Sequence, residues 1–226
     1  MDTLTAIPFF RGVPPEVARR HAASAVWVFA AAGQSLLDFE DESRDVFFVL
    51  AGSVRVVVRT PGGRELILDD LGPGRYFGEM SAIDGAPRSA SVTALHTTRI
   101  CRVTADGLLA LLADAPELSL ALLRELVARV RSGNARLFEL AALDTRHRVH
   151  AELLRLAGPP GPGGERVISP PPMQQVIANR IGAAREAVSR EVARLLREGL
   201  LARRRGALVL CDPAALERAL AVRMEA

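Results

Sequence analysis

The hydrophobic pattern of the chain changes its period about halfway along. Between Ala25 and Arg102, apolar residues form short runs rich in valine and aromatic side chains, and turn-forming residues such as Gly52 separate them. Short strands at near-regular spacing predict an antiparallel sandwich or barrel. Pro61-Gly62-Gly63 is expected to form a hairpin turn. The runs expected to be strands are residues 26–29, 46–50, 54–58 and 65–68.

From Pro116 onward the pattern has a helical period, and apolar residues recur every seven positions. Both rows of the heptad, a and d, are maintained over about three heptads, which is just enough to support a parallel helix pair. We therefore predict a homodimer formed through a helix at residues 116–143. The alternative is one amphipathic helix packed on its own β domain. The two rows are Leu123, Val130 and Leu137, and Leu126, Gly133 and Leu140.

Three domains follow from these patterns. Residues 1–21 are expected to be a short helical lead-in, and Thr104 is expected to cap a small helix after the β region. Asp144 has the residue type of an N-cap and predicts a helix at 145–157 that begins where the seam ends. The predicted domains are an N-terminal β domain at 1–115, the long helix at 116–143 and a C-terminal domain at 144–226.

The C-terminal domain has the element order of a winged helix-turn-helix. Three prolines, Pro170 to Pro172, precede a predicted helix at 173–181, and Gly182 separates it from a second predicted helix at 184–198. Helix, glycine turn, helix is the arrangement of that motif. A hairpin with a basic tip follows at 200–210 and is expected to form the wing.

Two features of this domain are less expected. Glu191 occupies a position in the second helix where a buried apolar residue is usual. His147 and His150 lie near the start of the helix at 145–157, and no other metal ligands accompany them. We therefore expect solvated or capping roles for both histidines, and no metal site.

Composition excludes several classes of protein. A hydrophobic content of 49% and a charged content of 24% are typical of a globular chain. The two cysteines, Cys101 and Cys211, lie far apart, which argues against a structural zinc site or a disulfide framework. No basic segment followed by an apolar one opens the chain, and no apolar run is long enough to span a membrane. We expect a soluble, cytoplasmic protein without a membrane partner.

The net charge of +3 conceals an asymmetry. Residues 146–226 contain 14 arginines and 8 acidic residues, a net charge of +6, whereas the residues before them carry −3. The chain has no lysine, a bias that genome composition also explains. Guanidinium groups suit phosphates and guanine edges. The asymmetry therefore favours nucleic-acid binding by the C-terminal third.

The stretch GRYFGEMSAIDGAPRSA, residues 74–90, combines two kinds of binding chemistry. A glycine-flanked turn carries Glu79, and a carboxylate accepts hydrogen bonds from ribose hydroxyls. The Arg-Ser-Ala triplet at 88–90 offers a guanidinium, a hydroxyl and main-chain N–H groups, which together can hold a phosphate. One sugar site beside one phosphate site predicts a nucleotide pocket. A surface salt bridge between Glu79 and Arg88 is the alternative.

The pattern FGEM followed by PRSA resembles the phosphate-binding cassette of cyclic-nucleotide-binding domains. The resemblance implies that Glu79 accepts the ribose 2′-OH and that Gly78 keeps the backbone close. It also implies that Arg88 pairs with the cyclic phosphate, helped by the Ser89 hydroxyl and the N–H groups of Ser89 and Ala90. No catalytic residue is predicted, because no nucleophile–base pair is present.

In the family resembled, the dimer helix meets the base, often through Thr or Ser. Here Gly133 and Asn134 stand at those positions, and we expect Gly133 to leave space for a purine and Asn134 to hydrogen-bond its edge. A packing glycine beside a buried asparagine is the alternative. The expected ligand contacts are Gly78, Glu79, Met80, Arg88, Ser89, Ala90, Gly133 and Asn134.

Arg185, Glu186 and Arg190 lie near the N-terminal end of the second predicted helix, from where they can reach the floor of a major groove. Arginine reads guanine bidentately, and glutamate accepts from cytosine N4. The Arg-Glu-x-x-x-Arg pattern resembles the catabolite activator branch of the CRP/FNR regulators, which implies palindromic half-sites like TGTGA. A solvated, salt-bridged helix face is the alternative. The expected DNA contacts are Arg185, Glu186, Ser189 and Arg190, with Arg203, Arg204 and Arg205 on phosphates.

The resemblance to bacterial CRP/FNR regulators covers nearly the whole chain. It implies an α+β fold with an N-terminal antiparallel β-roll of the jelly-roll (double-stranded β-helix) type, a long dimerisation helix and a C-terminal winged helix-turn-helix. The implied function is transcription regulation without enzyme activity or a cofactor. A cyclic nucleotide, cAMP first or else cGMP, would act as allosteric ligand, and the implied partners are double-stranded DNA and RNA polymerase. The alternatives are cyclic di-GMP, another effector, or none.

Overall fold

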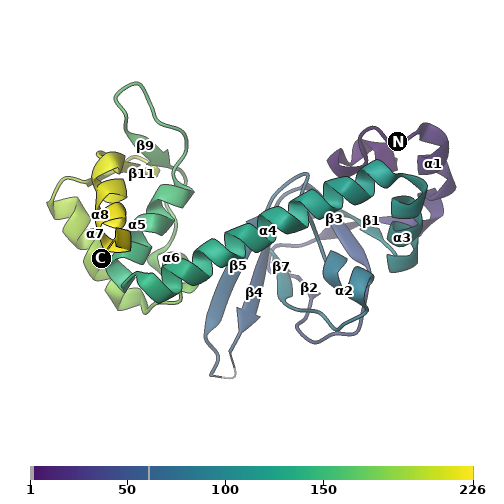
Figure 1. Cartoon of the computed structure of the whole chain (residues 1–226), viewed down its shortest axis with the longest axis horizontal. Helices are drawn as coiled ribbons and strands as arrows, with labels where there is room; N and C mark the ends of the chain where they lie inside the picture. The colour runs from purple at the N-terminus through teal and green to yellow at the C-terminus, as the bar shows by residue number, and fades with distance from the viewer. Residues whose placement is uncertain (1–2, 61, 226) are drawn as a thin grey trace. The chain divides into compact units, whose positions relative to one another are not determined.

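The computed structural model describes residues 3–60 and 62–225, with side chains up to residue 222. It divides into two compact units, Met1–Arg129 and Val130–Ala226. Figure 1 gives the order of the elements along the chain. No helix among the described residues is long and apolar enough to cross a membrane.

The first unit contains two four-stranded antiparallel sheets, with strand orders β1-β8-β3-β6 and β2-β7-β4-β5. This confirms the predicted α+β fold with a β-roll. The four predicted strands correspond to β1, β3, β4 and β5. The pattern does not predict the others, because three of them have at most four residues and two arginines interrupt the fourth. The strands are β1 Ala25–Ala30, β2 Ser35–Leu37, β3 Val46–Ala51, β4 Val54–Arg59, β5 Glu65–Leu71, β6 Tyr76–Phe77, β7 Ser91–Ala94 and β8 Thr98–Val103.

Strand β3 is apolar throughout because both of its faces are buried. Successive side chains of a strand point to opposite faces. Phe47 and Val49 belong to the core between the two sheets. Val46 and Phe48 belong to a second core, which the N-terminal helices and α3 (Ala105–Asp114) cover. The N-terminal elements are η1 Leu4–Ala6, η2 Pro8–Phe10, α1 Pro15–Arg20 and η3 Ala22–Ser24.

The hairpin turn between β4 and β5 lies where the sequence predicts it. The Thr60 N–H donates to the Arg64 carbonyl at 2.9 Å, and the Gly63 N–H donates to the Thr60 carbonyl at 2.9 Å. Gly63 has a φ of 76°, in the left-handed region that favours glycine. Pro61 lies outside the described residues.

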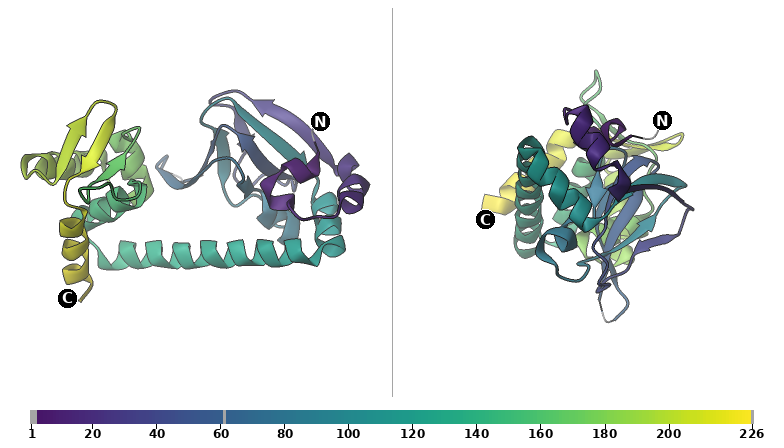
Figure 2. Two further views of the ribbon diagram at one scale, coloured as in Figure 1. Left: turned by 90° about the horizontal axis from the view of Figure 1, so that it is seen from above. Right: turned by 90° about the vertical axis from the view of Figure 1, so that its right-hand side faces the viewer.

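Helix α4 (Pro116–Ala142) is continuous and contributes to both units. Figure 2 shows α4 in a second view, together with the two sheets of the first unit and the helices of the second. Leu118 and Leu122 near its start belong to the core of the first unit. Three residues of the predicted seam, Leu123, Val130 and Leu137, are 57%, 62% and 66% exposed.

The second unit is a helical domain with a three-stranded sheet of order β10-β11-β9. The Asp144 carboxylate accepts the His147 N–H at 3.0 Å and so caps α5 as expected. Gly182, with a φ of 61°, ends the first helix of the helix-turn-helix. Apolar residues of α5, α6, α7 and the wing form one core. The elements are α5 Thr145–Leu156, β9 Arg166–Ile168, α6 Gln174–Ile181, α7 Arg185–Arg197, β10 Leu201–Arg204, β11 Ala207–Leu210 and α8 Pro213–Glu225.

The expectation for His150 is wrong. Its side chain is buried, 2% exposed, and its Nε2 lies 2.6 Å from Oε1 of Glu191 on α7. His147 fits the capping role, since its Nδ1 lies 2.8 Å from Oδ1 of Asp144. The sequence pattern gives no sign that His150 and Glu191 meet, because they lie 41 positions apart. The fold brings them into one buried pair.

Candidate ligand site and nucleic-acid interface

Glu79 is the buried acid of the candidate ligand site. It opens α2 (Glu79–Asp84), a short helix between two left-handed glycines, and it is 2% exposed. Its Oε1 accepts a hydrogen bond from Nη1 of Arg129 at 2.7 Å. Its Oε2 is buried and has no hydrogen-bond partner among the described residues. A buried acceptor left unpaired is costly, so this atom is a ready site for a hydroxyl donor.

Burial raises the pKa of the Glu79 carboxyl, and the nearby Arg129 guanidinium opposes that rise. The Arg129 guanidinium therefore favours the ionised form of this carboxyl, against the effect of burial. A hydroxyl that donates to Oε2 would, like Arg129, lower the pKa of Glu79 and favour its charged form.

Arg129 on α4 is a site residue that the sequence analysis misses. Besides Glu79, its guanidinium binds Glu125 Oε1 at 3.0 Å and the Tyr76 carbonyl at 3.1 Å. It also lies 4.8 Å from the centre of the Tyr76 ring, a cation–π distance. The spacing of Glu125 and Arg129 suggests only a solvated helix pair. The partner that matters, Glu79, lies 50 residues away and leaves no local signal.

Arg88 is 2% exposed and is held by three acceptors. Nη1 donates to the Gly78 carbonyl at 2.8 Å, Nη2 to the Asp45 carbonyl at 2.7 Å, and Nε to the Ser43 hydroxyl at 3.1 Å. All three acceptors are neutral, so they fix the guanidinium without cancelling its charge. Burial lowers the pKa of Arg88, although carboxylates nearby favour the cation. A positioned cation of this kind suits an anionic ligand.

Only glycine fits at position 78. Its φ is 85°, and a Cβ there would lie 2.8 Å from both Nη1 of Arg88 and the Asp45 carbonyl oxygen. The glycine therefore permits the close approach of Arg88 to the start of α2.

The remaining predicted ligand contacts lie around this pair. Ser89 is exposed, and its hydroxyl lies 3.7 Å from the sulfur of Met80, which is 51% exposed. Ala90 is buried at the entry to β7. The fold thus gathers the six predicted contacts between 78 and 90 around one acid and one cation.

Gly133 and Asn134 are exposed residues of α4 in the second unit. A Cβ added to Gly133 would meet no atom within 4 Å. Their predicted contacts with a base stay predictions.

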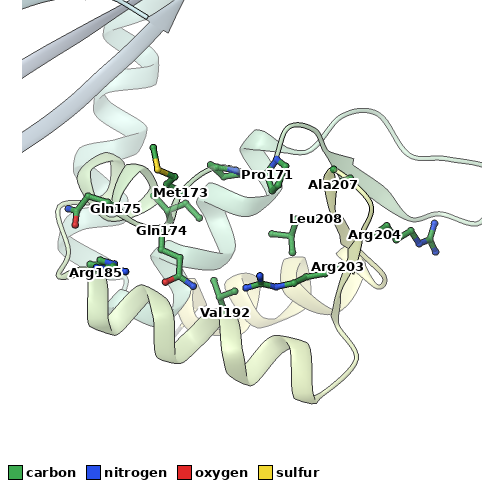
Figure 3. Close-up of a pocket in the computed structure, with 13 residues that line it drawn as sticks. Pro171, Met173, Gln174, Gln175, Arg185, Val192, Arg203, Arg204, Ala207 and Leu208 are labelled. Carbon is green, nitrogen blue, oxygen red and sulfur yellow. The ribbon is translucent and has the colours of Figure 1, made fainter. Parts of the chain in front are cut away.

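The second unit carries the predicted DNA contacts on α7 and the wing. Arg185, Glu186 and Arg190 are exposed, and Ser189 is half-buried. Of the three wing arginines, all exposed, Arg204 binds Oε1 of Glu165 at 3.1 Å. A hollow of about 730 Å³ is lined by α7, the wing and residues between 171 and 177 at the start of the helix-turn-helix. Figure 3 shows Arg185 and Val192 on its α7 side and Arg203 and Leu208 on its wing side, with Arg204 pointing away.

A second hollow, of about 390 Å³, lies on the α5 side of α7. Its lining includes Arg146 at the start of α5 and Arg190, Arg194 and Arg197 on α7. Both sides of this helix therefore carry arginines, although Arg194 is paired with Glu191 and Glu198.

Two family models match the chain. The model described as a cyclic nucleotide-binding domain matches residues 27–115. The model described as a Crp-like helix-turn-helix domain matches residues 147–219.

Curated relatives match nearly the full length. A CRP-like cAMP-activated global transcriptional regulator of Mycobacterium tuberculosis is 30% identical over 219 residues, which are 96% of this chain and 98% of the relative. A cyclic AMP receptor protein of Thermus thermophilus is 30% identical over 214 residues, 93% of this chain and 95% of the relative.

A solved structure agrees with these relatives. The crystal structure of the Thermus thermophilus catabolite activator protein matches with a TM-score of 0.54 at 29% identity, covering 96% of this chain and 99% of that one. Since both domain models and full-length relatives agree, the chain belongs to the CRP family of cyclic-nucleotide-binding, helix-turn-helix transcription regulators, a family of regulators rather than enzymes.

Proposed function

We propose that this protein is a cAMP-responsive regulator that binds a palindromic, TGTGA-like DNA site as a homodimer. The observation that carries the ligand assignment is the buried, unpartnered Oε2 of Glu79, nine residues along the chain from Arg88 and its neutral acceptors. The ribose 2′-OH can donate to Oε2 of Glu79, and the cyclic phosphate supplies the anion for Arg88.

The choice of cAMP rests on the relatives. Those of Mycobacterium tuberculosis and Thermus thermophilus are named for cAMP. Ribose and phosphate are common to cAMP and cGMP, so the groups around Glu79 and Arg88 favour neither base. The base contacts are assigned to Gly133 and Asn134, where Gly133 has open space around it within its own chain. The second candidate ligand is therefore cGMP.

The dimer is proposed through α4. Leu123, Val130 and Leu137 lie seven residues apart on one helix face and are each more than half exposed. Exposed leucine and valine in a heptad row are expected to bury against the same row of a second copy.

The DNA contacts are assigned by chemistry. Arg185 and Arg190 would read guanine, and Glu186 would accept from cytosine. Arg203, Arg204 and Arg205 would bind phosphates, and RNA polymerase is the proposed protein partner of the DNA-bound dimer.

Ligand binding would act through Arg129. This residue joins Glu79 to α4, so a ribose hydroxyl on Glu79 changes the electrostatic environment of a dimer-helix residue. The ligand would then shift the population of helix arrangements toward the one that binds DNA.

Titration calorimetry with cAMP, cGMP and cyclic di-GMP, paired with a gel-shift assay on a TGTGA palindrome, tests this function. We expect cAMP to bind and to raise the affinity for the palindrome over a scrambled site. Binding of none of the three nucleotides, or equal affinity for both DNA sites, would contradict the proposal.

A further inference from the structure

The joint between α4 and α5 is bridged by side chains. Helix α4 ends at Ala142 and α5 begins at Thr145, so only Leu143 and Asp144 connect them. Across this joint, Nη2 of Arg155 on α5 donates to both carboxylate oxygens of Glu139 on α4, at 2.6 and 2.9 Å. The contact is a charge-assisted hydrogen bond in which one guanidinium nitrogen is shared between two carboxylate oxygens. It ties the C-terminal part of α5 to the end of α4.

Arg155 also faces inward. Its Nη1 donates to Oε2 of Glu152, a carboxylate that is only 1% exposed. Removing a buried carboxylate from water is expensive unless it is paired. Glu152 thus has a physical requirement for Arg155.

The chain of charges continues into the helix-turn-helix. Oε1 of Glu152 lies 3.7 Å from Nη1 of Arg180, whose side chain is 10% exposed and belongs to α6. Beside it, Nη1 of Arg148 on α5 donates to the carbonyl of Ile181, the last residue of α6, at 2.7 Å. Helix α5 is therefore fastened to α4 at one end and to α6 at the other. Glu139, Arg155, Glu152 and Arg180 are called the relay below.

The relay alternates in sign and joins three helices. An exposed salt bridge is worth little, but here the central carboxylate is buried and cannot change partners without a cost in free energy. Movement of the end of α4 relative to α5 therefore separates Arg155 either from Glu139 or from Glu152. The low-energy response is for α5 and α6 to follow α4 together.

We propose that Arg155 is a positioning residue that transmits the position of α4 to the helix-turn-helix through the relay. The proposal rests on the proposed function only for the identity of the signal, since the relay lies within one unit. It assigns to Arg155 control of the ligand response, and no contact with ligand or DNA.

The first test needs no ligand. Hydrogen–deuterium exchange is measured on the full chain for the wild type, Glu139→Gln, Arg155→Lys and the control Arg218→Gln. Arg218 is an exposed arginine on α8 whose side chain pairs with Asp212. We expect faster exchange of the α6 amides in both relay variants, although Glu139 lies on α4, and no change in the control. Unchanged exchange in α6 would overturn the proposal.

The second test measures the ligand response. The ratio of affinities for the TGTGA palindrome with and without cAMP is expected to fall about fivefold or more in Glu139→Gln, while the affinity without cAMP stays near that of the wild type. Equal loss of affinity with and without cAMP would indicate a merely structural role and overturn the proposal. If the wild type itself ignores cAMP, the proposed function fails, and the exchange measurement alone decides on the relay.

Discussion

The two candidate binding sites, one in each unit, use arginine in opposite ways. In the β-roll, Arg88 is 2% exposed and donates three hydrogen bonds to neutral acceptors. In the helix-turn-helix, Arg185 and Arg190 are exposed to solvent. Folding has already desolvated and ordered Arg88. A small anion that binds it therefore keeps most of the interaction energy. Arg185 and Arg190 remain hydrated and adjustable, which suits a long polyanion whose binding depends on salt.

The largest effect is expected from altering the buried cation. Arg88→Lys keeps the charge but loses the planar fork that fills three acceptors. We expect the affinity for cAMP, measured by calorimetry, to fall about 100-fold, in line with charged hydrogen bonds of 1.5–3 kcal/mol each. Arg59→Lys, on an exposed β-strand arginine paired with Glu65, is the control and should keep the wild-type affinity. Similar affinities for all three proteins would remove the distinction between buried and exposed arginines.

Two glycine-to-alanine substitutions, one in each unit, are expected to change the free energy of unfolding in opposite directions. Gly78→Ala places a Cβ 2.8 Å from Arg88 at a φ of 85°, and should lower the free energy of unfolding by about 2 kcal/mol. Gly133→Ala adds a Cβ that meets nothing in its own chain, and should raise it by up to about 1 kcal/mol through helix propensity. Urea denaturation measures both. A stabilising Gly78→Ala would contradict the close packing of the cassette.

On the exposed surface the two kinds of contact should separate. Arg185→Ala should reduce discrimination against a substituted guanine about tenfold, the low end for a bidentate base contact. Arg204→Ala should weaken all sequences alike and reduce the slope of log affinity against log salt by about 1. Fluorescence anisotropy on matched and substituted sites at several salt concentrations tests both. The same sequence-independent loss from both variants would assign Arg185 to phosphate.

The smallest effect concerns an exception, a buried titratable pair within the DNA-binding unit. Burial lowers the pKa of His150, and Arg194 and His147 act in the same direction, while Glu191 opposes them. The native imidazole therefore stays neutral at a pH where the unfolded one, with a pKa of about 6.5, has taken up a proton. The contribution of His150 to the free energy of unfolding is complete above the unfolded pKa. It is lost as the pH falls from there through the lower pKa of the native state.

Urea denaturation at pH 7.5 and 5.5 checks this. We expect His150→Gln to lose less stability between the two pH values than the wild type, and the exposed control His96→Gln to behave like the wild type. A wild type that becomes more stable at pH 5.5, with His150→Gln losing that gain, would reverse the sign assigned to His150.

Much of the fold could be predicted because its signals are local. The valine-rich runs, the glycine turns, the Asp144 cap and the Gly182 break each depend on neighbouring residues, and each element is present. The short strands β2 and β6 have three and two residues. Strands of this length depend on their partners, so the pattern gives them no period to detect.

The candidate ligand site could also be predicted only as far as its signals are local. Glu79 and Arg88 belong to one local motif, but Arg129 reaches Glu79 from a helix 50 residues away. The Glu139–Arg155 contact of the relay and the His150–Glu191 pair likewise join residues 16 and 41 positions apart. Of these contacts, the sequence indicates only that Glu191 has a partner, because a charged residue at a buried apolar position needs one.

The central claim is that the free acceptor of Glu79 binds a ribose hydroxyl. Calorimetry with cAMP and 2′-deoxy-cAMP, on the wild type and on Glu79→Gln, tests it most directly. We predict that the wild type binds the deoxy analogue about tenfold to a hundredfold more weakly than cAMP, since a hydrogen bond to a charged group contributes 1.5–3 kcal/mol, and that Glu79→Gln reduces this difference to a few fold. Equal affinity of the wild type for the two nucleotides would contradict the account.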